Sequence, residues 1–188
     1  MATVTWLGDV LRAAGCEVIA TDGWRERGRP PSTGGFDPIG VLWHHTATRA
    51  TRDDPYPTRG FVISGSSSLP GPLCHLLLDR RGRFHLLAAG RANHAGASRG
   101  AGPIPAGDGN ATMVGIEIEY DGVEQRMLQR QSDAAVLGTA AVLRRLGRPA
   151  RYARGHRETS TTGKIDPTGV DLDAMRADVR ARLEGWGA

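Results

Sequence analysis

The chain has 188 residues, of which 39% are hydrophobic and 23% are charged. This length suits one compact domain, and the composition excludes collagen-like and low-complexity proteins. No apolar run approaches the roughly 20 residues that cross a bilayer, so no membrane association is expected. The net charge is +4. The arginines alternate with acidic residues, and aromatic residues are scarce; both features disfavour a nucleic-acid-binding surface. A basic surface would equally suit an anionic cell wall.

The first residues and the cysteines indicate the compartment. Met1 to Gly8 lacks a basic start followed by an apolar core, so we expect no signal peptide. We therefore expect the protein to be made in the cytoplasm. Separately, we expect it to be a monomer. Cys16 and Cys74 form no Cys-x-x-Cys ligand pair. Buried thiols are the default for both, although a disulfide stays possible.

The periodicity of hydrophobic residues, and the glycines and prolines that separate the periodic segments, predict a mixture of helices and strands. We expect helices at 6–14, capped by Thr3 or Thr5, and at 56–64, 125–146 and 170–183. We expect strands at 16–20, 39–43, 73–79, 83–88, 113–120 and 151–155, with a hairpin turn at 80–82. Residues 97–110 show little periodicity and are interpreted as an irregular binding rim or lid.

The segment Gly155 to Thr168 concentrates chemistry in a predicted loop. It offers an imidazole at His156, the only lysine of the chain at Lys164 and a carboxylate at Asp166. If residues 164–166 are extended, Lys164 and Asp166 point the same way. The alternative is an ordinary polar surface loop.

Three further side chains could complete such a site. The strand at 39–43 ends in His44 and His45, which face opposite sides, so one of them could simply be a core histidine. A catalytic zinc takes three protein ligands and leaves one position open, and His44, His156 and Asp166 would supply them. Glu117 could act as the base, unless it merely lies on a half-exposed strand together with Glu119.

Four motifs occur in a recognisable order: His-x-Thr-Ala at 44–47, Asn-His-Ala-Gly at 93–96, Val-Gly-Ile-Glu-Ile-Glu at 114–119 and Gly-His-x7-Lys-x-Asp-Pro at 155–167. Together they resemble the zinc-dependent N-acetylmuramoyl-L-alanine amidases, a family that includes amidase-type phage lysozymes and peptidoglycan recognition proteins. The resemblance covers roughly residues 36–183. It implies a single α/β domain with a mixed central sheet flanked by helices and zinc in a surface groove. Residues 1–35 would form an N-terminal helix and loop extension.

The resemblance also implies residue roles. His44, His156 and Asp166 match the zinc ligands, Glu117 the general base, and Lys164 the basic group that stabilises the transition state. Asn93 and His94 lie where family members contact substrate. The implied reaction is hydrolysis of the amide between N-acetylmuramic acid and L-alanine of peptidoglycan, as in phage endolysins, with delivery to the wall through a holin.

One departure concerns the middle strand. Many members carry Tyr-His or Phe-His there, and the tyrosine is catalytic in some, whereas this chain has Cys74-His75. A thiol cannot replace that tyrosine, which gives Glu117 more weight, but Cys74 could reach zinc as a soft ligand if the fold brings it close. The alternative functions are a peptidoglycan-binding module without catalysis and a regulatory or nucleic-acid-binding protein.

Overall fold

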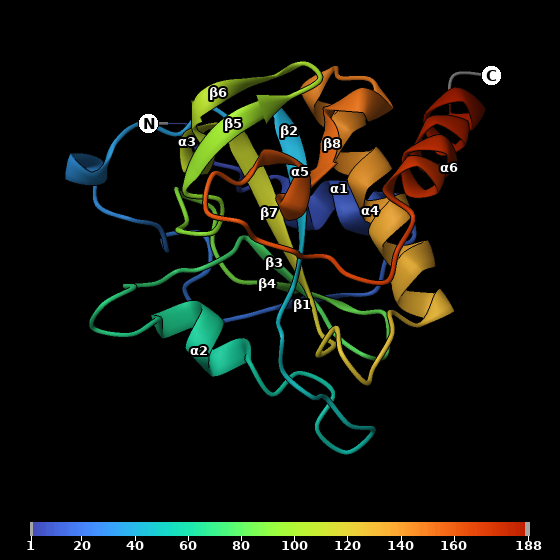
Figure 1. Cartoon of the computed structure of the whole chain (residues 1–188), viewed down its shortest axis with the longest axis horizontal. Coiled ribbons are helices and arrows are strands. Elements are labelled where there is room, and N and C mark those ends of the chain that lie inside the picture. Colours follow the sequence, from blue (N-terminus) through green and yellow to red (C-terminus); the bar gives the residue numbers. More distant parts are fainter. Residues whose placement is uncertain (1, 187–188) are drawn as a thin grey trace.

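A six-stranded mixed sheet forms the centre of the computed structural model, which describes residues 2–186 (Figure 1). Its strand order is β1-β4-β3-β7-β2-β8. All neighbouring strands are parallel except β3 and β4. The strands are β1 (Val18–Ala20), β2 (Gly40–His45), β3 (Leu76–Leu78), β4 (Phe84–Leu86), β7 (Met113–Ile118) and β8 (Ala153–Gly155). The predicted α/β fold with a mixed sheet is confirmed.

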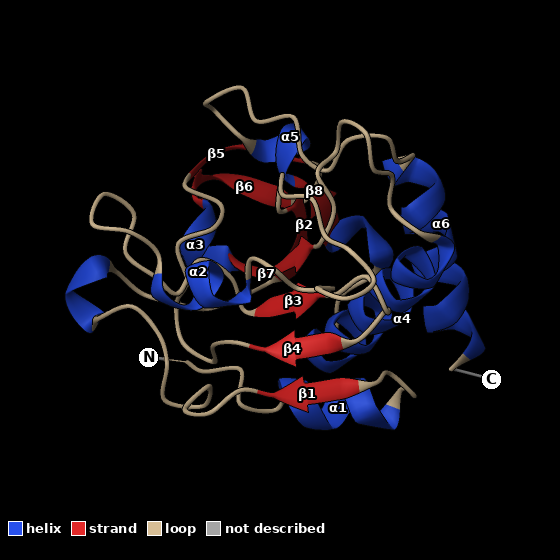
Figure 2. Cartoon of the chain, turned by 90° about the horizontal axis from the view of Figure 1, so that it is seen from below, coloured by secondary structure: helices blue, strands red, loops and turns tan. Residues whose placement is uncertain are grey.

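Three helices cover one face of this sheet (Figure 2). They are α1 (Leu7–Ala13), α4 (Gln129–Leu146) and α6 (Leu172–Gly185). Alternation along the strands turns Trp43 and Ile116 toward these helices, where both are fully buried in the main core. The indole of Trp43 also donates to Thr139 Oγ1 at 2.9 Å, which fixes α4 on the sheet.

Short elements and loops cover the opposite face, on which the next residues along the strands, His44 and Glu117, project. They include α2 (Arg59–Ser64), α3 (Gly109–Thr112), α5 (His156–Thr159) and a hairpin of β5 (Ala97–Ala101) and β6 (Ile104–Asp108). Two 3-10 turns, η1 (Pro31–Thr33) and η2 (Ala150–Tyr152), complete the described elements.

The hairpin corrects the expectation that residues 97–110 are irregular. Glycine and proline mask its strand character, because neither residue favours a strand interior. Gly100, Gly102 and Gly107 adopt positive φ, which only glycine accepts readily. Asp108 then caps α3 by accepting from the Asn110 N–H at 3.0 Å.

Two smaller expectations also change. The N-cap of α1 is Trp6 without a side-chain cap, so neither Thr3 nor Thr5 performs that role. The segment 155–168 is a loop only in part, because its first residues form α5, with Glu158 accepting from the Gly155 N–H at 2.8 Å. Within residues 2–186, no helix is both long and apolar enough to cross a membrane.

Candidate metal centre

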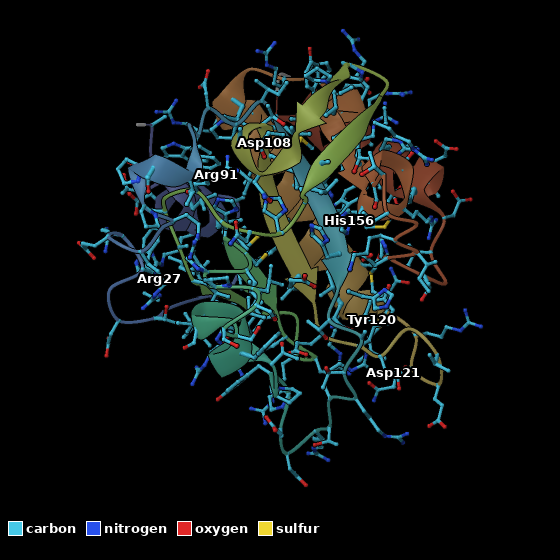
Figure 3. All side chains as sticks on the ribbon, turned by 60° about the vertical axis from the view of Figure 1, so that its left-hand side comes forward. Arg27, Arg91, Asp108, Tyr120, Asp121 and His156 are labelled. Atoms are coloured by element: carbon cyan, nitrogen blue, oxygen red, sulfur yellow. The ribbon has the colours of Figure 1, made fainter. Side chains whose placement is uncertain are left out.

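Three of the predicted site residues meet at one point. His44 lies near the end of β2, His156 begins α5 directly after β8, and Asp166 comes from the following loop. His44 Nδ1 lies 3.1 Å from His156 Nδ1 and 3.0 Å from Asp166 Oδ2, and His156 Nδ1 lies 3.1 Å from the same oxygen. Figure 3 shows His156 beside the blue ribbon of β2.

The loop is closed by Arg157. Its backbone N–H donates to the Asp166 carbonyl at 2.7 Å, and its guanidinium donates to the carbonyls of Pro167 and Val170. These contacts explain how residues ten apart in sequence bring His156 and Asp166 together.

The donor set fits zinc. Two imidazole nitrogens and one carboxylate oxygen are common zinc ligands, and zinc bonds of about 2.0–2.1 Å in a tetrahedron place ligand atoms about 3.3 Å apart. The observed separations of 3.0–3.1 Å are close to that value.

The outer ring nitrogens fix which atom of each histidine is free. His156 Nε2 lies 3.2 Å from the Ala95 carbonyl, which can only accept, so this nitrogen carries the proton. His94 Nε2 likewise donates to the Met113 carbonyl at 3.1 Å. His94 Nδ1 is therefore an acceptor and takes the proton of His44 Nε2 at 3.0 Å. His44 and His156 are both left with a free lone pair on Nδ1, the form in which a histidine can bind a metal.

Electrostatics keep these groups in their ligating forms. Burial lowers the pKa of His44 to about 4, so its imidazole is neutral at physiological pH. Burial alone would raise the pKa of Asp166, but the neighbouring His156 and His44 side chains outweigh that effect and hold the pKa far below its usual range. Asp166 is therefore ionised.

Glu117 lies beside His44. The two residues are paired across the parallel strands β7 and β2, so their side chains project from the same face. Glu117 Oε2 is buried and has no hydrogen-bond partner. Burial, followed by the charges of Asp166 and Glu119, raises its pKa to about 8, and the charge of Lys164 opposes that rise. A carboxyl group whose pKa lies this close to neutral pH is suited to proton transfer.

Lys164 and Asn93 line a cleft of about 360 Å³ that also exposes His94 and His156. Lys164 is exposed to solvent. Its charge reaches into the site, because it lowers the pKa of both Glu117 and His44. Asn93 donates to the Pro70 carbonyl at 2.8 Å and so stands at the rim.

Other candidates lie away from this point. Glu119 is fully buried and accepts from Thr58 Oγ1 at 2.6 Å and Thr46 Oγ1 at 2.9 Å. The alternative interpretation, in which Glu117 and Glu119 lie on a half-exposed strand, is thus wrong for Glu119, because the segment after β2 covers it. His45 faces the other way, where its Nδ1 accepts from the Thr168 N–H at 3.2 Å.

Cys74 does not join the ligand group. It is fully buried, and its thiol donates to the carbonyls of Gly115 at 2.9 Å and Leu76 at 3.0 Å. Burial raises its pKa well above the usual range, which disfavours the thiolate that zinc requires. Cys74 and Cys16 are both free thiols.

Residues 35–169 match the family described as N-acetylmuramoyl-L-alanine amidase. The chain belongs to this family. The predicted family and enzyme class are therefore confirmed. No curated protein sequence matches the chain.

Solved structures share the fold of this amidase. A selenomethionine derivative of AmpD has 19% identity and a TM-score of 0.60, covering 87% of this chain and 93% of that chain. PlyL has 17% identity and a TM-score of 0.63, covering 89% and 98%. The endolysin LysCS from Clostridium intestinale has 15% identity and a TM-score of 0.58, covering 87% and 95%.

Two residues that position the amidase site escaped the sequence analysis. Asn110 Oδ1 accepts the backbone N–H groups of His94, Ala95 and Gly96 at 2.8–3.2 Å, which shapes the turn that carries His94. Gly115 leaves room for the same ring, since a Cβ there would lie 2.6 Å from His94 Nδ1. The Gly115 signal was present in the Val-Gly-Ile-Glu motif, but nothing local marked Asn110.

Proposed function

We propose that this amidase is a zinc hydrolase that cleaves the amide between the lactyl group of N-acetylmuramic acid and L-alanine, and that it serves as a phage-type endolysin. The convergence of His44 Nδ1, His156 Nδ1 and Asp166 Oδ2 beside the unpartnered Glu117 Oε2 supports the zinc-dependent reaction. The endolysin role rests on the fold shared with LysCS. It includes synthesis in the cytoplasm and holin-type release to the wall, and the protein acts as a monomer.

Different residues of the chain carry different steps of the reaction. Bound zinc would supply Lewis-acid activation of water and carbonyl. Glu117 accepts the proton of the attacking water on its carboxylate and returns it to the leaving amine of L-alanine. The Lys164 ammonium approaches the scissile carbonyl oxygen, where negative charge develops in the transition state.

Asn93 and His94 take different parts in this proposal. Asn93, at the rim of the cleft, contacts the substrate. His94 exposes one edge to the cleft, but both of its ring nitrogens are engaged, one with the Met113 carbonyl and one with His44. We assign it chiefly to orienting His44, since partners of this kind fix the tautomer and direction of a metal-binding histidine.

Mass analysis of digested peptidoglycan tests the reaction. With zinc present, free stem peptides bearing an L-alanine amine are expected, and a chelator should abolish them.

Elemental analysis should find about one zinc per chain and much less in His156→Ala. Wall binding without release of stem peptides would favour a binding module instead, and full zinc occupancy in His156→Ala would exclude this metal site.

A further inference from the structure

A second cleft, of about 910 Å³, has an arginine-rich lining unlike that of the zinc-site cleft. Its charged lining residues are Arg49, Arg52, Arg80, Arg81 and Arg130, which we call the arginine cleft. They come from the loop after β2, the turn between β3 and β4, and the first turn of α4. Figure 1 shows these segments on the lower side of the molecule. The arginine cleft shares no lining residue with the cleft at the zinc site.

The walls of the arginine cleft are held in place. Gln125 and Ala50 exchange two hydrogen bonds, at 2.7 and 3.1 Å, which tie the loop after β2 to the segment before α4. Arg81 donates to the Arg52 carbonyl at 3.1 Å. The Arg80 guanidinium donates to Gln131 Oε1 at 2.9 Å. The backbone segments that carry the arginines are therefore tied to one another, and the guanidinium groups of Arg80 and Arg81 are held by hydrogen bonds.

Their charges are poorly compensated. No carboxylate lines the cleft, and among residues 2–186 only Arg49 of the five forms an ion pair, with the exposed Glu124. The neighbouring Asp121 is already engaged, because its Oδ1 accepts the N–H groups of Val123 and Gln125. Burial and the charge of Arg130 lower the pKa of Arg80, and the charges of Asp121 and Glu119 only partly oppose that fall.

We propose that the arginine cleft binds a polyol-phosphate chain of the cell wall. A guanidinium fork matches the two free oxygens of a phosphodiester, and five such groups around one cleft suit a repeating anion better than a single ion. The volume lies in the range of roughly 300–1,000 Å³ that ligand sites occupy. The choice of a wall polymer rests on the proposed function, since such chains are attached to the peptidoglycan that the amidase would cleave.

Titration calorimetry with purified poly(glycerol phosphate) at several salt concentrations tests the assignment. The variant is Arg52→Gln/Arg130→Gln, because both side chains are exposed and neither makes a hydrogen bond or an ion pair among the described residues. The matched control is Arg180→Gln/Arg182→Gln on α6, which removes the same charge from an exposed surface. We expect at least tenfold weaker binding in the cleft variant, a salt slope lower by about one per arginine, and less than a twofold change in the control.

Several results would overturn the proposal. They are no binding by the unmodified protein, equal losses in the two double variants, or equal affinity for polyglutamate of the same charge, which would remove the preference for phosphate. Equal or tighter binding of single-stranded DNA would identify nucleic acid as the ligand of the arginine cleft. Calorimetry needs no catalysis, so these outcomes are separate from a failure of the amidase reaction. Turnover of a soluble muramyl-peptide should be the same in both variants, whereas lysis of intact walls should fall only in the cleft variant.

Discussion

Glu117 and Glu119 stand two residues apart on the same face of one chain segment, yet their carboxylates have different surroundings. Glu119 is satisfied by Thr46 and Thr58, whereas Glu117 has an unpartnered oxygen beside His44. The hydrogen bonds of Glu119 hold structure together. The isolation of Glu117 leaves its carboxylate available for a proton.

Glu117→Gln should keep zinc and lose activity, because the amide has the same shape but cannot accept the proton of water. A fall in kcat of about 10²–10⁴ is expected for a lost general base. Glu119→Gln is the matched control, and it should lower the melting temperature with little effect on kcat of the folded enzyme. Kinetics on a soluble muramyl-peptide with zinc content measured in parallel decides the matter, and a crippled Glu119→Gln beside an active Glu117→Gln would reverse the assignment.

The raised pKa of Glu117 also predicts a pH-dependent stability in zinc-free protein. Burial raises its folded-state pKa from 4.5 to about 8, so the folded state binds more protons than the unfolded state between these values. The protonated carboxyl of Glu117 makes its full contribution to the free energy of unfolding below about pH 4.5, and this contribution is lost as the pH rises toward 8. Glu117→Gln should therefore become more stable than the parent across that interval and keep a constant advantage above it. Urea unfolding of both proteins in a chelator measures the difference, and parallel pH profiles would contradict the buried carboxyl.

Lys164 should act as a positioned point charge. Lys164→Ala should fold, bind zinc and lose about 10²–10³ in rate, which is the usual loss for one preorganised donor. Lys164→Arg keeps the charge but replaces a compact ammonium with a wide planar fork, so it should restore little. Single-turnover rates with measured zinc occupancy test both variants. Near-normal turnover of Lys164→Ala would remove this residue from the chemistry.

At the scale of elements, the sequence was most informative where periodicity is strong. The long helix α4 and the strand β7 were predicted with small errors at their ends, because apolar spacing determines their buried faces. The β5–β6 hairpin was missed because its glycines and prolines obscure the alternation. The ligands could be proposed from ordered motifs, but the turn anchored by Asn110 depends on a contact across 14–16 residues that no local pattern encodes.

Strand β7 sets the position of His94, and Gly115→Ala tests that role. A Cβ at 115 would lie 2.6 Å from the His94 ring, so the ring must move and its hydrogen bond to His44 should be lost. We expect at least tenfold weaker zinc binding by competition with a chelator, in line with the loss of an outer-shell partner. Gly60→Ala is the control, because its Cβ would meet nothing within 4 Å. Unchanged zinc affinity in Gly115→Ala would show that His94 does not orient the ligand.

At the scale of the whole molecule, residues before the amidase match belong to the same core. Val4, Leu7, Leu11 and Trp24 are buried in the main hydrophobic cluster, and β1 pairs with β4 at the edge of the sheet. The N-terminal segment, predicted as an extension, thus covers part of the sheet that also carries the site. The functional motifs begin after this N-terminal segment, but the hydrophobic core that supports them includes residues of the segment itself.

This packing predicts that residues 2–34 cannot be removed without loss of the fold. Deleting them would expose the buried face under α1 and leave the edge of β4 unpaired, so the shortened chain should show no cooperative unfolding. Leu11→Ala provides a graded version, since truncating a fully buried leucine costs about 2–5 kcal/mol. Val123→Ala, at a side chain that is 84% exposed, should change the free energy of unfolding by less than about 0.5 kcal/mol. Urea titrations followed by circular dichroism measure all three, and a shortened chain that unfolds cooperatively near the midpoint of the full-length protein would show that the amidase core is self-sufficient.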